Sequence, residues 1–127
     1  MPLLLDTHAV IWWSADAPQL SSAAGEAIRV EPLVYVSAAS VFEITTKHRL
    51  GKLPQVDKIV GDLKGFIADE GFRELPISVQ HAQIAGTLPG PSRDPFDRLL
   101  IAQAMVEKLQ LVSIEQPFDA YPVRRLW

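Results

Sequence analysis

The chain opens with a short apolar run that ends in a carboxylate. Leu3–Leu5 are three leucines, and Asp6 follows them directly. A short apolar run closed by a polar residue is typical of a buried strand, which places Asp6 just past the carboxyl end of that strand. Because ligands of open α/β sheets sit outside the carboxyl ends of the strands, Asp6 lies where a site would be built. A carboxylate that ends a buried strand also needs a partner.

The remainder of the chain alternates between strand and helix patterns. Further strands are predicted over 33–36, 73–75, 111–113 and 123–127, and helices over 7–14, 23–30, 38–50, 56–70, 78–85 and 94–109. This alternation predicts βαβ units and an α/β fold with a mostly parallel sheet. Right-handed crossovers would cover both faces of the sheet with helices. With 127 residues, we expect a single domain over 1–127.

Composition narrows the class of protein. The chain is 48% hydrophobic and 21% charged, as globular proteins are, and the absence of cysteine excludes disulfides, thiol catalysis and cysteine-based zinc sites. No apolar run approaches the ~20 residues that span a bilayer, and the N-terminus lacks the basic region of a secretory signal. We therefore expect a soluble, cytoplasmic protein without membrane contact. The net charge of −3 is unusual for a nucleic-acid binder, although acids gathered in one metal site would leave the remaining surface closer to neutral.

The strand and helix order brings four acidic residues to one edge of the sheet. Asp6 and Glu115 follow strands directly, whereas Glu43 and Asp97 lie in the opening turns of helices that begin at the same edge. Crowded carboxylates repel one another, and a divalent cation removes that cost. Mg²⁺ or Mn²⁺ prefers oxygen ligands and can activate a water for attack on a phosphodiester. Two hydroxyl residues are placed to support these ligands: Thr7 and Ser113.

Each acid also has a purely structural interpretation. Glu43 with Ser40 matches a capping box, which would only satisfy backbone N–H groups. Asp94 is most simply the N-cap of the helix that follows, and Asp97 would favour the dipole of its first turn. Glu115 fits a solvated loop. Asp6 is the acid for which a structural role is hardest to argue.

The basic residues and histidines leave alternatives open. Lys47 lies four residues after Glu43 and fits either an ordinary helix ion pair or a phosphate contact. Arg93 and Arg98 flank the acids and fit either RNA phosphates or a solvated face. The histidines share no metal-binding spacing and are interpreted as structural or partly exposed: His8, His48 and His81.

Several motifs stand in a characteristic order over nearly the whole chain. They are Leu5–His8 (LDTH), Ser37–Lys47 (SAASVFEITTK), Gly51–Leu53, Leu75–Ile77, Asp94–Ala104 (DPFDRLLIAQA) and Leu111–Ser113, with Phe118 and Tyr121 after them. In this order they resemble the PIN-domain family, and within it the VapC-type toxins of bacterial toxin–antitoxin pairs. The combination of LDTH and DPFDRLLIAQA is specific to this family.

The resemblance implies a three-layer α/β/α sandwich and a Mg²⁺- or Mn²⁺-dependent endoribonuclease that hydrolyses RNA with a metal-activated water. The family's metal ligands map onto Asp6, Glu43 and Asp97, and its fourth acid maps onto Glu115. Asp6 and Asp97 would be the principal direct ligands, whereas Glu43 would orient or deprotonate the attacking water.

The resemblance also implies partners. A cognate VapB-like antitoxin would block the site, and the toxin would form a homodimer. Three apolar residues of the early helices are candidate contact surfaces: Trp12, Trp13 and Phe42.

Two positions depart from the family pattern. Glu115, in Ser113-Ile114-Glu115, stands where the family usually has Thr-x-Asp, so its longer side chain changes the reach of the fourth acid. Ser92 stands where relatives often carry histidine. The alternative function is a non-catalytic PIN-like module that binds RNA or protein, but such a module should have lost a core acid. A phosphate-receiving signalling domain fits less well, since no lysine follows Lys108.

Overall fold

The computed structural model describes all of residues 1–127 and contains a five-stranded sheet in the order β3-β2-β1-β4-β5. Every neighbouring pair of strands is parallel. The strands are β1 (Leu3–Leu5), β2 (Val34–Ser37), β3 (Arg73–Leu75), β4 (Gln110–Val112) and β5 (Arg125–Leu126). The prediction of a mostly parallel α/β sheet is thus confirmed.

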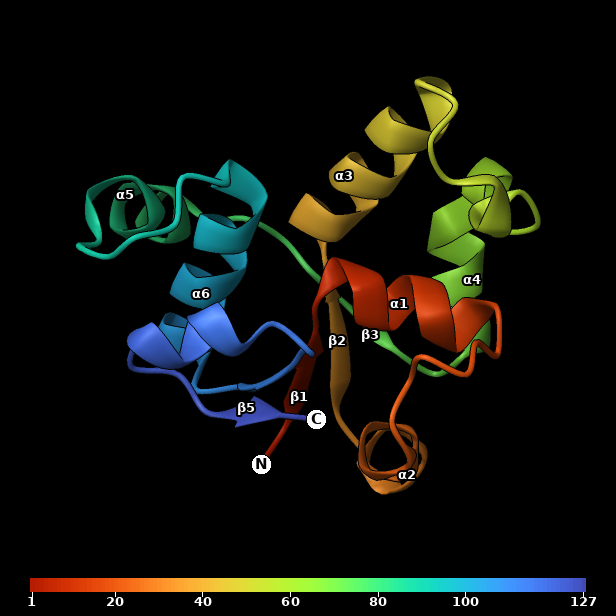
Figure 1. The fold of residues 1–127 in the computed structure, drawn as a ribbon, viewed down its shortest axis with the longest axis horizontal. Coiled ribbons are helices and arrows are strands. Elements are labelled where there is room, and N and C mark those ends of the chain that lie inside the picture. The colour runs from red at the N-terminus through yellow and green to blue at the C-terminus, as the bar shows by residue number, and fades with distance from the viewer.

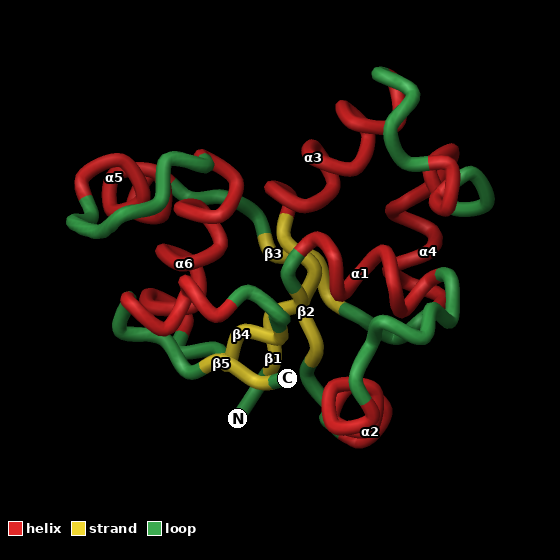
Figure 2. Tube along the Cα trace, in the orientation of Figure 1, coloured by secondary structure: helices red, strands yellow, loops and turns green.

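Helices cover both faces of this sheet. They are α1 (Thr7–Ser14), α2 (Ser22–Val30), α3 (Ala38–Arg49), α4 (Leu63–Asp69), α5 (Val79–Thr87) and α6 (Pro95–Glu107). Figure 1 shows α1, α2 and α4 on one side and α5 and α6 on the other, with the strands between them in Figure 2. The three-layer α/β/α architecture is confirmed.

The alternation of side chains along β1 explains why two helical layers form. Leu3 and Leu5 point into one core, which also contains Ile28 of α2 and Ile67 of α4. Leu4 points the other way, into a core that it shares with residues of α6 and β4. Successive side chains of a strand face opposite sides of a sheet, so one leucine triplet supplies both cores.

Helix starts follow short polar side chains. Asp6, Ser37, Ser78 and Asp94 are the N-caps of α1, α3, α5 and α6, and each accepts a hydrogen bond from a backbone N–H of the first turn. The predicted cap Asp94 is confirmed. Since Ser37 caps α3, Ser40 lies within the helix, and the capping-box interpretation of Glu43 is wrong.

The helix predicted over 56–70 is interrupted. Two 3₁₀ turns, Pro54–Val56 and Val60–Asp62, precede α4. The Asp62 carboxylate accepts a hydrogen bond from the Gly65 N–H at 2.9 Å and so starts a new helix. A Cβ at residue 65 would clash with the Asp62 carboxylate as it is placed, so any larger residue there would have to displace the capping side chain. The strand predicted over 123–127 is shorter in the structure, where β5 comprises only Arg125–Leu126.

The strand order creates a switch point at the centre of the sheet. From β1 the chain moves to β2 and β3 on one side, then crosses to β4 and β5 on the other. Ligands of such sheets bind at this switch, outside the carboxyl ends of the strands. In Figure 1, α1 and α3 both begin at that edge. No helix has the length and apolar character needed to cross a membrane.

Candidate active site at the carboxyl edge of the sheet

Asp6 lies at the end of β1 and is only 3% exposed. Its Oδ1 accepts a hydrogen bond from the Ala9 N–H at 2.8 Å, and the Ser113 hydroxyl also bonds to the carboxylate. Burial raises the pKa of Asp6 to about 6, and these two hydrogen bonds only partly oppose the rise. The Asp6 carboxylate is therefore held in place by hydrogen bonds, and no basic side chain forms an ion pair with it.

Asp97 is the third residue of α6, held there by its N-cap. Asp94 Oδ1 accepts hydrogen bonds from the N–H groups of Phe96 at 2.8 Å and Asp97 at 3.3 Å. Burial raises the pKa of Asp97 to about 7, and the charges of four other carboxylates add to the rise. These are Asp94, Glu43, Asp6 and Glu115, so the other three predicted acids all lie within electrostatic range of Asp97.

Glu43 is 5% exposed but, unlike Asp6 and Asp97, has polar partners on both oxygens. Its Oε1 accepts a hydrogen bond from the Thr7 hydroxyl at 2.6 Å, and its Oε2 lies 2.6 Å from Lys47 Nζ. That hydrogen bond is the main cause of the raised pKa of Lys47, to which Asp94 and Asp97 also contribute. Lys47 thus makes the ordinary helix ion pair and lies within electrostatic range of the acids.

Glu115 reaches the same edge from the segment after β4. Its N–H donates a 2.9 Å hydrogen bond to the hydroxyl of the buried Ser113, which also bonds to Asp6. The Glu115 carboxylate is half-buried, and its charge helps to raise the pKa of Asp6 and Asp97. Glu115 lies in a loop, as the solvated-loop interpretation has it, and its charge also acts on the other acids of this edge.

The donor set of this edge suits a hard cation. The ligands on offer are carboxylate and hydroxyl oxygens, and two of the carboxylates have no positively charged partner. No three acidic or histidine side chains stand in an arrangement that could hold a metal ion, and Glu43 is engaged by Thr7 and Lys47. Mg²⁺ commonly binds through one or two carboxylates and several waters, so Asp6 and Asp97 fit it without a third direct ligand.

Arg98 has a role that the sequence did not reveal. Its guanidinium donates hydrogen bonds to the backbone carbonyls of Ala85 at 2.7 Å, Ser92 at 2.8 Å and Leu88. The solvated-face interpretation is therefore wrong, and no RNA phosphate is needed to explain the position of this side chain. Arginine's planar fork satisfies several carbonyls at once, and here it ties α6 to the loop before it.

Tyr121 holds the same loop from the other side. Its hydroxyl accepts a 2.9 Å hydrogen bond from the Ser92 N–H. Gly90 has φ +142°, and a Cβ there would come within 2.3 Å of the Tyr121 ring. The loop over 88–93 is thus fixed on two sides immediately before Asp94. The contacts of Tyr121 with Ser92 and Gly90 have no local sequence signal, because the partners are far apart along the chain.

The histidines and the tryptophans of α1 contact other parts of the fold or are exposed. His81 is 2% exposed and completes the capping box of α5, because its ring accepts a hydrogen bond from the N–H of the N-cap Ser78. Its Nε2 lies 2.8 Å from a carboxylate oxygen of Glu107 on α6. Trp12 packs on Trp127, and Trp13 packs on Phe72. The other two histidines also fit the prediction: His48 pairs with Asp57, and His8 is exposed.

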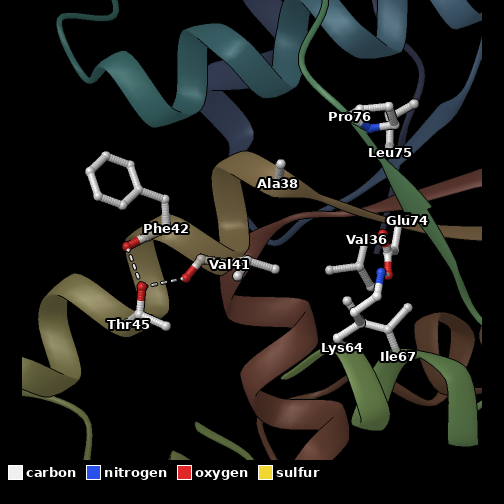
Figure 3. Close-up of a pocket in the computed structure, with 10 residues that line it drawn as sticks. All are labelled: Val36, Ala38, Val41, Phe42, Thr45, Lys64, Ile67, Glu74, Leu75 and Pro76. Carbon is white, nitrogen blue, oxygen red and sulfur yellow. Dashed lines mark hydrogen bonds and ion pairs between the residues drawn. The ribbon is translucent and has the colours of Figure 1, made fainter. Parts of the chain in front are cut away.

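A groove of about 570 Å³ adjoins this edge, with walls from α3, α4 and β3 (Figure 3). Val41 of α3 and Ile67 of α4 are among its apolar residues, and Phe42 is at its rim. None of the predicted acids lines this groove. The acids and the groove are therefore separate features that share α3.

Comparisons with known proteins agree with this architecture. The family model of the PIN domain matches residues 3–122. Ribonuclease VapC22 of Mycobacterium tuberculosis is 32% identical over 112 residues, which are 87% of this chain and 85% of that protein.

Two solved structures share the fold at low identity. VapBC2 from Rickettsia felis, bound to a DNA fragment from its promoter, has a TM-score of 0.70 at 14% identity, covering 99% of this chain and 98% of that chain. Mycobacterium tuberculosis VapC20, a sarcin-ricin loop cleaving toxin, has a TM-score of 0.64 at 14% identity, covering 93% of each chain. With a family model over nearly the whole length and a VapC relative of this identity, the chain belongs to the PIN-domain family, in its VapC-type branch.

Proposed function

We propose that this chain is a metal-dependent endoribonuclease and the toxin of a type II toxin–antitoxin pair. The observation that carries the proposal is the Asp97 carboxyl, whose pKa of about 7 reflects burial and four neighbouring carboxylates. A fold does not keep acids crowded in this way unless something offsets their repulsion. The names of the relatives, a ribonuclease and a cleaving toxin, support the same chemistry.

Each acid has a role in this proposal. Asp6 and Asp97 are the direct ligands of Mg²⁺ or Mn²⁺, and Glu43 orients or deprotonates the attacking water. A bound divalent ion would polarise the phosphodiester and lower the pKa of its water. Thr7 and Ser113 hold the carboxylates in place through their hydroxyls.

Three flanking residues affect the charge or the position of the acids. Lys47 forms an ion pair with Glu43 and supplies positive charge near the phosphate, while Asp94 fixes the start of α6. Glu115 adds negative charge that strengthens the attraction for a cation. Because its side chain is longer than the aspartate usual in the family, Glu115 is assigned no direct metal bond.

The first experiment is cleavage of RNA by the purified protein in Mg²⁺, with EDTA as a control. Asp6→Asn keeps an N-cap side chain at α1, so we expect a folded protein with at least 100-fold less activity. Asp69→Asn, at an exposed acid ending α4, is the matched control and should cleave at the normal rate. Cleavage that survives both EDTA and Asp6→Asn would contradict the metal mechanism. If no RNA is cut with antitoxin absent, the non-catalytic binding module is favoured.

The proposal includes a VapB-like antitoxin and a homodimer. Solved neighbours that are toxin–antitoxin complexes support the first of these. Of the three apolar residues considered for contacts, Trp12 and Trp13 are largely committed to the fold. Co-expression with the small protein encoded beside this chain, followed by mass measurement in solution, tests both partners.

A further inference from the structure

Phe42 is the aromatic side chain that the fold leaves exposed. It is 64% exposed, whereas every other aromatic residue of the chain is buried or half-buried. In Figure 3 its ring projects from α3 away from Val36 and Ile67, so it does not fill the groove there. A large exposed ring contributes little to the stability of the core.

The ring of Phe42 lies beside the candidate site. Phe42 immediately precedes Glu43 on α3, and Phe96 immediately precedes Asp97 on α6. The two rings meet nearly edge to face, with centroids 5.8 Å apart and planes at 71°. This aromatic pair therefore bridges α3 and α6 next to two of the acids, and most of the Phe42 ring stays open to solvent.

Beyond Glu43, the chain that continues from Phe42 along α3 and the following turn is basic. Residues 44–56 contain no acidic residue but include Lys47, Arg49 and Lys52. Arg49 is seven residues after Phe42, two helical turns further along the same face, and it is exposed. An exposed ring followed by positive charge is the arrangement with which proteins hold single-stranded nucleic acid.

We propose that Phe42, supported by Phe96, stacks on an unpaired base of the RNA next to the bond that is cut. This inference rests on the proposed function, since a phosphodiester at Asp6 and Asp97 brings its flanking bases to this pair. A base inside a duplex is already stacked and paired, so the pair selects unpaired regions such as loops and single strands.

The test uses single-stranded RNA with one 2-aminopurine and randomised flanking positions, whose fluorescence falls when the base stacks. Protein and RNA are mixed rapidly in Mg²⁺, and the signal is read before products form. We expect quenching with the wild-type chain, equal quenching with Phe42→Tyr, and loss of at least half of it with Phe42→Leu. Phe42→Leu should also weaken RNA binding about tenfold. Val30→Ser, at another exposed apolar residue, is the matched control and should behave as wild type.

Two outcomes would overturn the inference. One is full quenching by Phe42→Leu, and the other is equal binding of a duplex carrying the same 2-aminopurine. If Phe42→Leu binds RNA normally but loses a protein partner, the ring belongs to a protein interface instead. Because the signal precedes cleavage, a wild-type chain that cuts no RNA would refute the proposed function while the stacking result still stands on its own.

Discussion

Glu43 and Asp97 illustrate two ways in which a buried acid is tolerated. Glu43 gives one oxygen to Thr7 and the other to Lys47, so its charge is compensated inside the chain. Asp97 has carboxylate neighbours instead, and burial together with their charges raises its pKa to about 7. Under the proposed function, the first arrangement orients Glu43 toward a water, and the second leaves Asp97 to bind a cation.

At this scale we predict that Asp97→Asn abolishes cleavage while stabilising the metal-free protein at pH 8. The pKa of Asp97 is about 7 in the folded protein, against an ordinary value of 3.8, so folding favours the protonated form. The stability of the wild type therefore falls as pH rises from about 4 to 7 and stays low above that. The neutral amide removes this cost. We expect a gain of about 1 kcal/mol at pH 8, less than the full pKa shift implies because the side chain is partly exposed.

Urea unfolding in EDTA at pH 5 and pH 8 measures this effect. Asp119→Asn is a control of opposite sign, because the hydrogen bond with Arg125 lowers the pKa of this exposed acid. It should give no stabilisation at pH 8. If Asp97→Asn is less stable than wild type at pH 8, the electrostatic account of this site is wrong.

At the scale of elements, α6 depends on the loop that precedes it. Arg98 donates to three carbonyls across the end of α5 and this loop, and Tyr121 accepts from Ser92. The loop delivers Asp94, which caps α6 and so sets the position of Asp97. The helix can be predicted from its own sequence, but its position in the fold depends on these contacts with residues outside the helix.

We predict that Arg98→Met destabilises the fold by about 2–3 kcal/mol, because carbonyls that accepted a charged donor lose it. Hydrogen exchange should accelerate over residues 85–94 more than over β1. Arg93→Met, at the exposed neighbouring arginine, is the matched control and should change stability by less than about 0.5 kcal/mol. Equal effects of the two substitutions would show that the hydrogen bonds of Arg98 do not hold this loop.

At the scale of the whole molecule, the parallel sheet brings acidic residues from separate segments to one edge. Asp6 comes from the end of β1, Glu43 from α3, Asp97 from α6 and Glu115 from the segment after β4. The strand order places β1 between β2 and β4, which brings the starts of these segments to the central strand. A bound cation would therefore link parts of the chain that are far apart in sequence.

We predict that Mg²⁺ raises the midpoint of thermal unfolding at pH 8 and has a smaller effect at pH 5.5. Asp6 and Asp97 have pKa values of about 6 and about 7, so protons compete with the ion at the lower pH. At Mg²⁺ concentrations about 100-fold above its dissociation constant, the stabilisation should be about 2–3 kcal/mol. The comparison is made by calorimetry with Asp6→Asn alongside. An equal rise in that variant, or at both pH values, would place the ion elsewhere.

The sequence by itself determined the parallel α/β class, most of the element positions and the edge at which four acids arrive. Those inferences follow from side-chain periodicity, cap residues and the direction of βαβ crossovers, all of which act locally or along the chain. Tertiary structure decided the partners of each side chain. Lys47 and Thr7 on Glu43, the carbonyls on Arg98 and the exposure of Phe42 depend on surfaces brought together by packing. Periodicity places a residue on a face, but only the folded chain determines what lies opposite it.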